Sequence, residues 1–238
     1  VVLVVYICRK DRTDKEPPAL IAKLLGYGVL SCLPAIVVEL ILSAIIERLN
    51  VRNAFLGYFL EAFVVAGLTE ETCKFLFLRT TWRNPAFDYQ FDAIVYAVMV
   101  ALGFAAFENV KYVYSYGFAT GIVRAVTAVP GHAIFGVFMG YFYGYAKLSD
   151  YWGRDDDRKA YLALSVVVPV LMHGCYDFLA FTQESDSRFT LLFYAYLVAL
   201  YVFGIRRVNR SSRDDRRVTR ETVFDYFRRM QYPMPPQY

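Results

Sequence analysis

The sequence predicts an all-α protein, a polytopic bundle of about seven membrane-spanning helices. Of the 238 residues, 57% are hydrophobic and 18% aromatic, and the mean hydropathy is positive at +0.34. A soluble domain of this size seldom needs so much apolar material. The charged residues are concentrated in short stretches between long apolar runs. A nucleic-acid-binding protein would instead spread its basic residues over a folded polar face, so the pattern disfavours that class.

The expected spans follow from the need for about 20 mostly apolar residues in each bilayer crossing. Residues 1–8 are too short for a complete span or signal peptide, and we expect them to belong to a further span. Six longer runs qualify, at residues 23–46, 55–78, 92–116, 122–146, 160–181 and 190–205. Because only short loops separate these runs, the sequence predicts one transmembrane domain over residues 1–205 and a basic tail over residues 206–238.

The basic residues predict the orientation, since lysine and arginine accumulate in cytosolic loops. With residues 1–8 counted as the first span, 19 basic residues fall in one set of gaps and four or five in the other. The larger set includes the nine arginines after residue 205. We therefore expect a multi-pass protein of the cell membrane with a cytosolic C-terminus. Within the tail, residues 218–230 are expected to form an amphipathic helix on anionic lipid.

Ionisable side chains inside the expected spans are the main indication of function. Each costs about 2.5–3.5 kcal/mol at the centre of a span by insertion scales, so each needs a partner or a role. The set comprises Glu39, Glu61, Glu70, Glu71, Lys74, Glu108, His132, His173 and Asp177. Both histidines of the chain are in this set. A polar network that only joins helices is the alternative, but two histidines among so many carboxylates favour a functional site.

Spacing assigns several of these side chains to helix faces. Glu70 and Lys74 are four residues apart and can form an ion pair on one face. Glu71 lies about 100° further around the helix, so the adjacent carboxylates can serve different roles. His173 and Asp177 are also four residues apart, and Asp177 can either ligate a metal or orient the imidazole.

Two other motifs bring polar groups into apolar surroundings. In GFAAFENVKY, Glu108 and Phe104 share a face, Asn109 lies beside it, and small residues allow close helix approach. In VPGHAIFG, we expect Pro130 and the glycine after it to loosen the helix just before His132 and to free backbone groups there.

The chemistry of the set suits hydrolysis. Two imidazoles and up to four carboxylates from four helices can bind zinc or a similar divalent cation with an open position for water. A spare carboxylate would then take a proton from the water. The same set can also activate water without a metal. Other intramembrane chemistries are disfavoured, because the chain lacks HExxH, GxSxG and the GxGD segment of presenilin-type aspartyl proteases.

These motifs resemble those of the PrsW-type intramembrane proteases, relatives of the CAAX-processing and bacteriocin-immunity membrane proteases. The family motif EExxK matches residues 70–74, and FxxxEN matches residues 104–109. A histidine after a proline matches residues 130–132, and an HxxxD-like motif matches residues 173–177. With the charged segment RKDRTDKEP, the likeness extends from about residue 6 to residue 205.

The resemblance implies a CAAX-protease-like helix bundle that acts as an endopeptidase on a single-pass membrane protein, such as an anti-sigma factor. By position, Glu70 is the base that activates water, and Glu71 assists it or ligates a metal. The whole expected catalytic set is Glu70, Glu71, Glu108, His132 and His173. The expected supporting residues are Lys74, Asn109 and Asp177. The expected ligands of a zinc ion are Glu108, His132 and His173, with Glu71 and Asp177 as further candidates.

Two other functions stay open at this point. One is a non-enzymatic cation- or proton-coupled transporter or membrane adaptor, although no internal repeat is visible. The other is a CAAX-type protease of prenylated proteins on the same fold; Glu108 stands where those relatives have histidine, which disfavours it. Outside the motifs, Glu39 is expected either to contact the site or substrate or to pack between helices. Glu61 is expected to pack or to lie near the outer interface.

Overall fold

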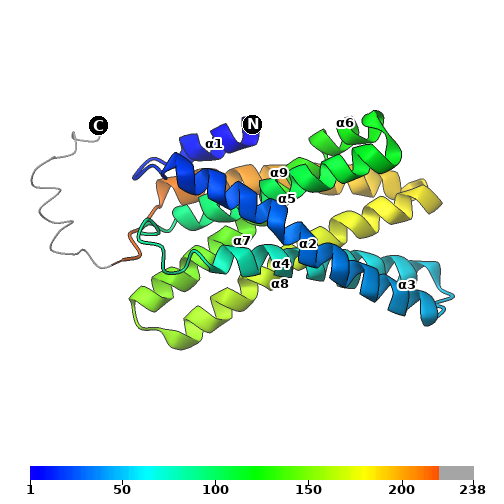
Figure 1. Cartoon of the computed structure of the whole chain (residues 1–238), viewed down its shortest axis with the longest axis horizontal. Helices are drawn as coiled ribbons and strands as arrows, with labels where there is room; N and C mark the ends of the chain where they lie inside the picture. Colours follow the sequence, from blue (N-terminus) through cyan, green and yellow to red (C-terminus); the bar gives the residue numbers. More distant parts are fainter. Residues whose placement is uncertain (220–238) are drawn as a thin grey trace, which may run out of the picture.

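The computed structural model describes residues 1–219, apart from the side chains of residues 184 and 185, and this part is built from helices (Figure 1). In chain order they are α1 (Val2–Lys10), α2 (Pro18–Arg48), α3 (Ala54–Phe59), η1 (Leu60–Leu68), α4 (Thr69–Arg79), α5 (Asp92–Tyr116), α6 (Phe118–Val126), α7 (Ala128–Tyr151), α8 (Asp155–Ser185) and α9 (Arg188–Arg213). Among these residues the only β-pairing is an isolated bridge between Tyr89 and Arg217. The predicted all-α class is confirmed.

Most of the predicted spans correspond to helices. Within the described part, five segments are long and apolar enough to cross a membrane: α2, α5, α6 together with α7, α8, and α9. The predicted run at residues 55–78 is the continuous stretch of α3, η1 and α4. The predicted boundary at residue 205 falls inside α9, which continues to Arg213. The amphipathic helix expected at residues 218–230 lies almost wholly outside the described residues.

The helices run along the long axis of the molecule and leave two ends (Figure 1). We call one the α1 end; it holds the α1–α2, α4–α5 and α7–α8 connections and the last turns of α9. The opposite one, the α6 end, holds the α2–α3, α5–α6 and α8–α9 connections. Most of the polar side chains singled out in the sequence, including Glu39, Glu61 and Glu108, lie in the parts of their helices nearer the α6 end.

Helix α5 is the centre of the bundle. In its most apolar 18-residue stretch 78% of the residues are buried, against 17% in α2, so α5 is surrounded by protein while α2 presents much of its surface outward. Glycines allow the close contacts. A Cβ on Gly103 would meet the carbonyl oxygen of Leu25 on α2, and a Cβ on Gly140 of α7 would meet that of Ala93. The contact at Gly103 confirms the close helix approach expected at the small residues of GFAAFENVKY.

The π-helical segment η1 was not predicted from the sequence. Its wider turns end at Leu68, directly before the paired glutamates of α4. It crosses α8 closely, because a Cβ on Gly67 would lie only 3.1 Å from the Val170 carbonyl oxygen and a Cβ on Gly174 would meet the Phe63 ring. Single π-turns inside helices often mark functional sites. Here the crossing brings the middle of α8 beside the start of α4.

The helix is interrupted before His132, as expected from Pro130. The break is at Thr127, three residues before Pro130, where a φ of −116° and a ψ of −70° separate α6 from α7. Pro130 has no N–H for the Val126 carbonyl oxygen four residues earlier, and this oxygen instead accepts a hydrogen bond from the Tyr201 hydroxyl at 2.6 Å. His132 consequently lies in the second turn of a regular helix.

Candidate active site

Lys74 lies at the centre of a buried polar cluster. Its ammonium group is 2.7 Å from Glu71 Oε1 and 3.1 Å from Glu70 Oε2, both on its own helix, and 3.0 Å from His132 Nδ1 on α7. It also lies over the Phe104 ring, 4.1 Å from the ring centroid. The predicted ion pair between Glu70 and Lys74 is present. Because Lys74 is only 1% exposed, its charge is offset by these partners and not by water.

His173 joins α8 to this cluster. Its Nδ1 lies 2.8 Å from Glu71 Oε1 and 3.9 Å from Glu70 Oε2, and its Nε2 lies 3.2 Å from Asp177 Oδ2. The Phe135 ring stacks on the imidazole at a centroid distance of 5.0 Å. Carboxylates on opposite edges and an aromatic ring on one face determine how this histidine is oriented. Asp177 thus bonds to the imidazole, one of the two roles that the spacing allowed.

Glu108 holds the other histidine. Its Oε2 lies 3.0 Å from His132 Nε2 and 2.6 Å from Arg124 Nη2. Arg124 lies on α6, and its guanidinium group is 3.6 Å from the Tyr112 ring centroid, in the geometry of a cation–π contact. Glu108 therefore connects α5, α6 and α7 at the α6 end.

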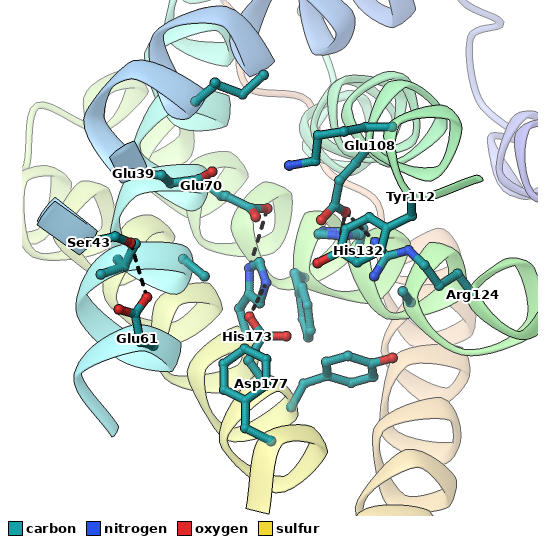
Figure 2. Close-up of a pocket in the computed structure, with 18 of the residues that line it drawn as sticks. Glu39, Ser43, Glu61, Glu70, Glu108, Tyr112, Arg124, His132, His173 and Asp177 are labelled. Atoms are coloured by element: carbon teal, nitrogen blue, oxygen red, sulfur yellow. Dashed lines mark hydrogen bonds and ion pairs between the residues drawn. The ribbon is translucent and has the colours of Figure 1, made fainter. Parts of the chain in front are cut away.

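A cavity of about 390 Å³ adjoins these groups (Figure 2). Figure 2 shows three groups of side chains around it: Glu39, Ser43 and Glu61; then Glu70, His173 and Asp177; then Glu108, Tyr112, Arg124 and His132. Glu71 and Lys74 do not line the cavity, and Glu71 is fully buried behind it. The two neighbouring glutamates thus have different positions: Glu70 faces the cavity, and Glu71 faces Lys74 and His173.

The donor atoms beside Lys74 fit a divalent cation in their chemistry. One atom from each of Glu70, Glu71, His132 and His173 lies within 4.8 Å of the other three. Glu71 Oε2 is buried and has no hydrogen-bond partner among the described residues, so its lone pairs are available. Carboxylate oxygens and imidazole nitrogens are common zinc ligands. The Lys74 ammonium contacts three of these residues, so a bound ion would compete with it for the same lone pairs.

The close donor group includes Glu70, the expected base, and lacks two of the expected zinc ligands, Glu108 and the further candidate Asp177. Glu108 is outside it, since its Oε2 is engaged by Arg124 and by the far nitrogen of His132. Asn109, expected to support the site, instead donates from Nδ2 to the Gly121 carbonyl oxygen at 3.4 Å and joins α5 to α6. It does not line the cavity. The remaining expected site residues lie together.

Some site residues were missed or assigned no definite role. Glu39 lines the cavity, as one of its two expected roles required. Glu61 also lines the cavity. Its carboxylate accepts a hydrogen bond from Ser43 on α2 at 3.3 Å, so Glu61 both joins two helices and belongs to the site. Arg124 and Tyr112 were not expected there. A signal for Arg124 was its place as a lone arginine near the start of an apolar run, three residues after Gly121.

Comparison with known proteins adds an independent observation. Residues 16–205 match the family model described as PrsW family intramembrane metalloprotease. The chain is 34% identical over 212 residues to Protease PrsW of Bacillus subtilis (strain 168), covering 89% of this chain and 91% of the relative. Protease PrsW of Oceanobacillus iheyensis is 34% identical over 88% of this chain and 91% of its own. Protease PrsW of Clostridioides difficile (strain 630) is 28% identical over 90% of this chain and 88% of the relative's chain. No solved structure matches the chain.

Proposed function

The chain belongs to the PrsW family of intramembrane proteases, and from this premise we propose that it is a metal-dependent endopeptidase that cleaves a single-pass membrane protein, with an anti-sigma factor as the expected substrate. The observation that carries the proposal is the meeting of Glu70, His132 and His173 around one cavity inside an apolar bundle. A peptide segment that enters this cavity meets a carboxylate and two imidazoles away from bulk water.

Glu70 is the proposed base. Of the paired glutamates it alone lines the cavity, so a water molecule there can reach its carboxylate. Glu70 accepts a proton as the water oxygen bonds to the peptide carbon, and returns it to the amine nitrogen as the C–N bond breaks. Tyr112 lines the same cavity and can donate a hydrogen bond to the peptide carbonyl oxygen.

Glu71 and Asp177 act through His173. Glu71 bonds one ring nitrogen of His173, and Asp177 bonds the other. Lys74 and Glu108 hold the two ring nitrogens of His132 in the same way. If a metal ion is bound, Glu71, His132 and His173 would hold it and leave Glu70 as the base. The ion would polarise the peptide carbonyl and lower the pKa of a bound water.

The proposed orientation places the C-terminus in the cytosol. The basic residues support it, because they accumulate at the α1 end. The cavity, nearer the α6 end, would then lie in the outer half of the membrane. Single cysteines at two exposed positions, Arg52→Cys at the α6 end and Asp156→Cys at the α1 end, test this in a cysteine-free background. A membrane-impermeant thiol reagent on intact cells should label only the first; labelling of only the second would refute the orientation.

Cleavage by purified protein tests the activity. Reconstituted protein should cut a single-pass substrate, and Glu70→Gln and His173→Ala should each lower the cleavage rate by about 10²-fold or more. Glu47→Gln, at an exposed position near the end of α2, is the matched control and should cleave normally. Undiminished cleavage by the first two variants would refute the assigned site. Cation flux in proteoliposomes that is lost in Glu108→Gln, without any cleavage, would favour the transporter instead.

Metal dependence has a separate test. Elemental analysis of purified protein should find a divalent ion that His173→Ala loses, and a chelator should stop cleavage. Metal-free protein whose cleavage resists chelators would refute the metal and leave the protease assignment intact.

A further inference from the structure

A second pocket lies at the α1 end, on the opposite half of the bundle from the cavity. Its volume is about 220 Å³, and it lies between the start of α5, the middle of α7 and the last turns of α9. Its lining includes Arg207, Arg210, Arg216, Tyr141 and Tyr145, and it shares no residue with the cavity beside Lys74. No step of the proposed proteolysis uses it.

The pocket carries unbalanced positive charge. Three arginines and one carboxylate, Asp214, line it, and that carboxylate lies 3.5 Å from Arg210 Nε. The guanidinium group of Arg207 lies over the Tyr141 ring, 4.1 Å from its centroid. Neither Arg207 nor Arg216 forms an ion pair with any residue that the structure describes. Two guanidinium groups are therefore available to an anion in the pocket.

The backbone around Arg216 is held in place. The Gln90 N–H donates to the Arg216 carbonyl oxygen at 2.8 Å. The Val218 N–H donates to the Asp88 carbonyl oxygen at 2.7 Å. The Phe91 N–H donates to Asp215 Oδ1 at 2.9 Å. These bonds join the segment after α9 to the segment before α5. The backbone of Arg216 is thereby held beside the pocket that Arg207 also lines.

The position corresponds to a membrane–water interface. The exposed residues Val202, Phe203 and Ile205 of α9 directly precede the arginines and suit contact with acyl chains. The arginines begin where the apolar stretch of α9 ends, which is the level at which lipid phosphates lie. A phosphate group can thus approach the pocket from the bilayer.

We propose that this pocket binds the phosphate of an anionic phospholipid headgroup, such as that of phosphatidylglycerol. Guanidinium groups match phosphate oxygens with paired hydrogen bonds, and basic pockets between transmembrane helices bind anionic headgroups. The unbalanced charge favours an anionic lipid over a zwitterionic one. Free phosphate shares the same chemistry, but the exposed apolar residues beside the pocket favour a lipid.

Lipid titration of the purified full-length chain in neutral detergent, followed by native mass spectrometry, tests the proposal. The probes are phosphatidylglycerol, phosphatidylcholine with the same acyl chains, and inorganic phosphate. Phosphatidylglycerol should bind about tenfold or more tightly than phosphatidylcholine. Equal affinity for the two lipids would overturn the proposal. The melting temperature should rise with phosphatidylglycerol and not with the same concentration of inorganic phosphate. An equal rise with inorganic phosphate would overturn the lipid assignment.

Paired variants separate this pocket from the general attraction of a basic surface. Arg207→Gln with Arg216→Gln should weaken phosphatidylglycerol binding about tenfold or more, since both guanidinium groups would lose their charge-assisted hydrogen bonds to the phosphate. The matched control, Arg206→Gln with Arg213→Gln, removes two exposed charges of α9 outside the pocket and should change binding less than about twofold. Equal losses in the two pairs would refute the pocket. Arg207→Lys with Arg216→Lys keeps the charges and should give an intermediate loss, which tests the site even if the glutamine pair does not fold.

Discussion

The Lys74 ammonium on α4 lies 3.0 Å from Nδ1 of His132 on α7. An ammonium group can only donate, so His132 accepts through Nδ1 and carries its proton on Nε2. That nitrogen lies 3.0 Å from Glu108 Oε2, to which it donates. A residue of the EExxK motif therefore determines the tautomer of a histidine on another helix, and the histidine in turn depends on a glutamate from a third.

Replacement of Lys74 by methionine should destabilise the protein. The change leaves two adjacent buried carboxylates, Glu70 and Glu71, without the ammonium that contacts both. Breaking a buried ion pair from one side costs about 3–5 kcal/mol, so the thermal unfolding midpoint in detergent should fall clearly. A second change, Glu71→Gln, should recover part of the loss. Lys159→Met, at an exposed ion pair with Asp156, is the control and should change little. No recovery in the double variant would contradict the pairing.

The two neighbouring glutamates should respond differently to the same substitution. Glu70→Gln should lower the cleavage rate about 10²–10⁴-fold with a small change in melting temperature, because the amide can still bond to Lys74. Glu71→Gln should lower both the rate and the melting temperature, because Glu71 is fully buried between Lys74 and His173. Initial rates and melting curves on the same preparations measure both quantities. If Glu70→Gln proves the less stable variant, the assigned roles are wrong.

Arg124 should prove to be a positioning residue for the site. Its Nη2 bonds Glu108 Oε2 at 2.6 Å, so Arg124→Gln should let Glu108 and His132 reorient. Loss of such an outer partner typically lowers activity about 10–100-fold. Arg124→Lys should recover part of the rate, because lysine keeps the charge without the planar fork. The control is Arg52→Gln, an exposed arginine at the same end of the bundle. A rate for Arg124→Gln equal to that of this control would rule out the role.

Glu16, in the loop between α1 and α2, should make stability depend on pH. The pKa of Glu16 is raised from 4.5 to about 7, and burial is the largest cause. The Tyr96 hydroxyl, which donates to Glu16 Oε1 at 2.8 Å, lowers this pKa, while neighbouring carboxylates including Asp11 raise it. The folded state thus holds this proton more firmly than the unfolded state. The stability from Glu16 is fully present below about pH 4.5 and is lost as the pH rises through about 7.

Glu16→Gln should therefore raise the melting temperature at pH 8 and make little difference near pH 5. Asp14→Asn changes an exposed carboxylate in the same loop and should show no such pH-dependent gain. Melting curves from pH 5 to 8 measure both. A gain for Glu16→Gln that is equally large at pH 5 would contradict the assignment.

Local patterns predicted much of the fold. The expected span at residues 92–116 coincides with α5, because a long apolar run closed by Gly117 marks both ends of a helix. The pairing of Glu70 with Lys74 and of His173 with Asp177 followed from helical spacing. The π-helical η1 was not predicted, since it depends on packing against neighbouring helices and not on hydropathy.

The sequence by itself determined the helical class, most spans and the set of ionisable groups, because hydropathy and the 3.6-residue period are properties of single segments. Only the tertiary structure decided how these groups meet. It placed Glu70 at the cavity and Glu71 behind it, centred the cluster on Lys74, and brought Arg124 to Glu108. The distances between these side chains depend on how closely the helices cross. The glycine contacts and the π-helical segment η1 determine those crossings.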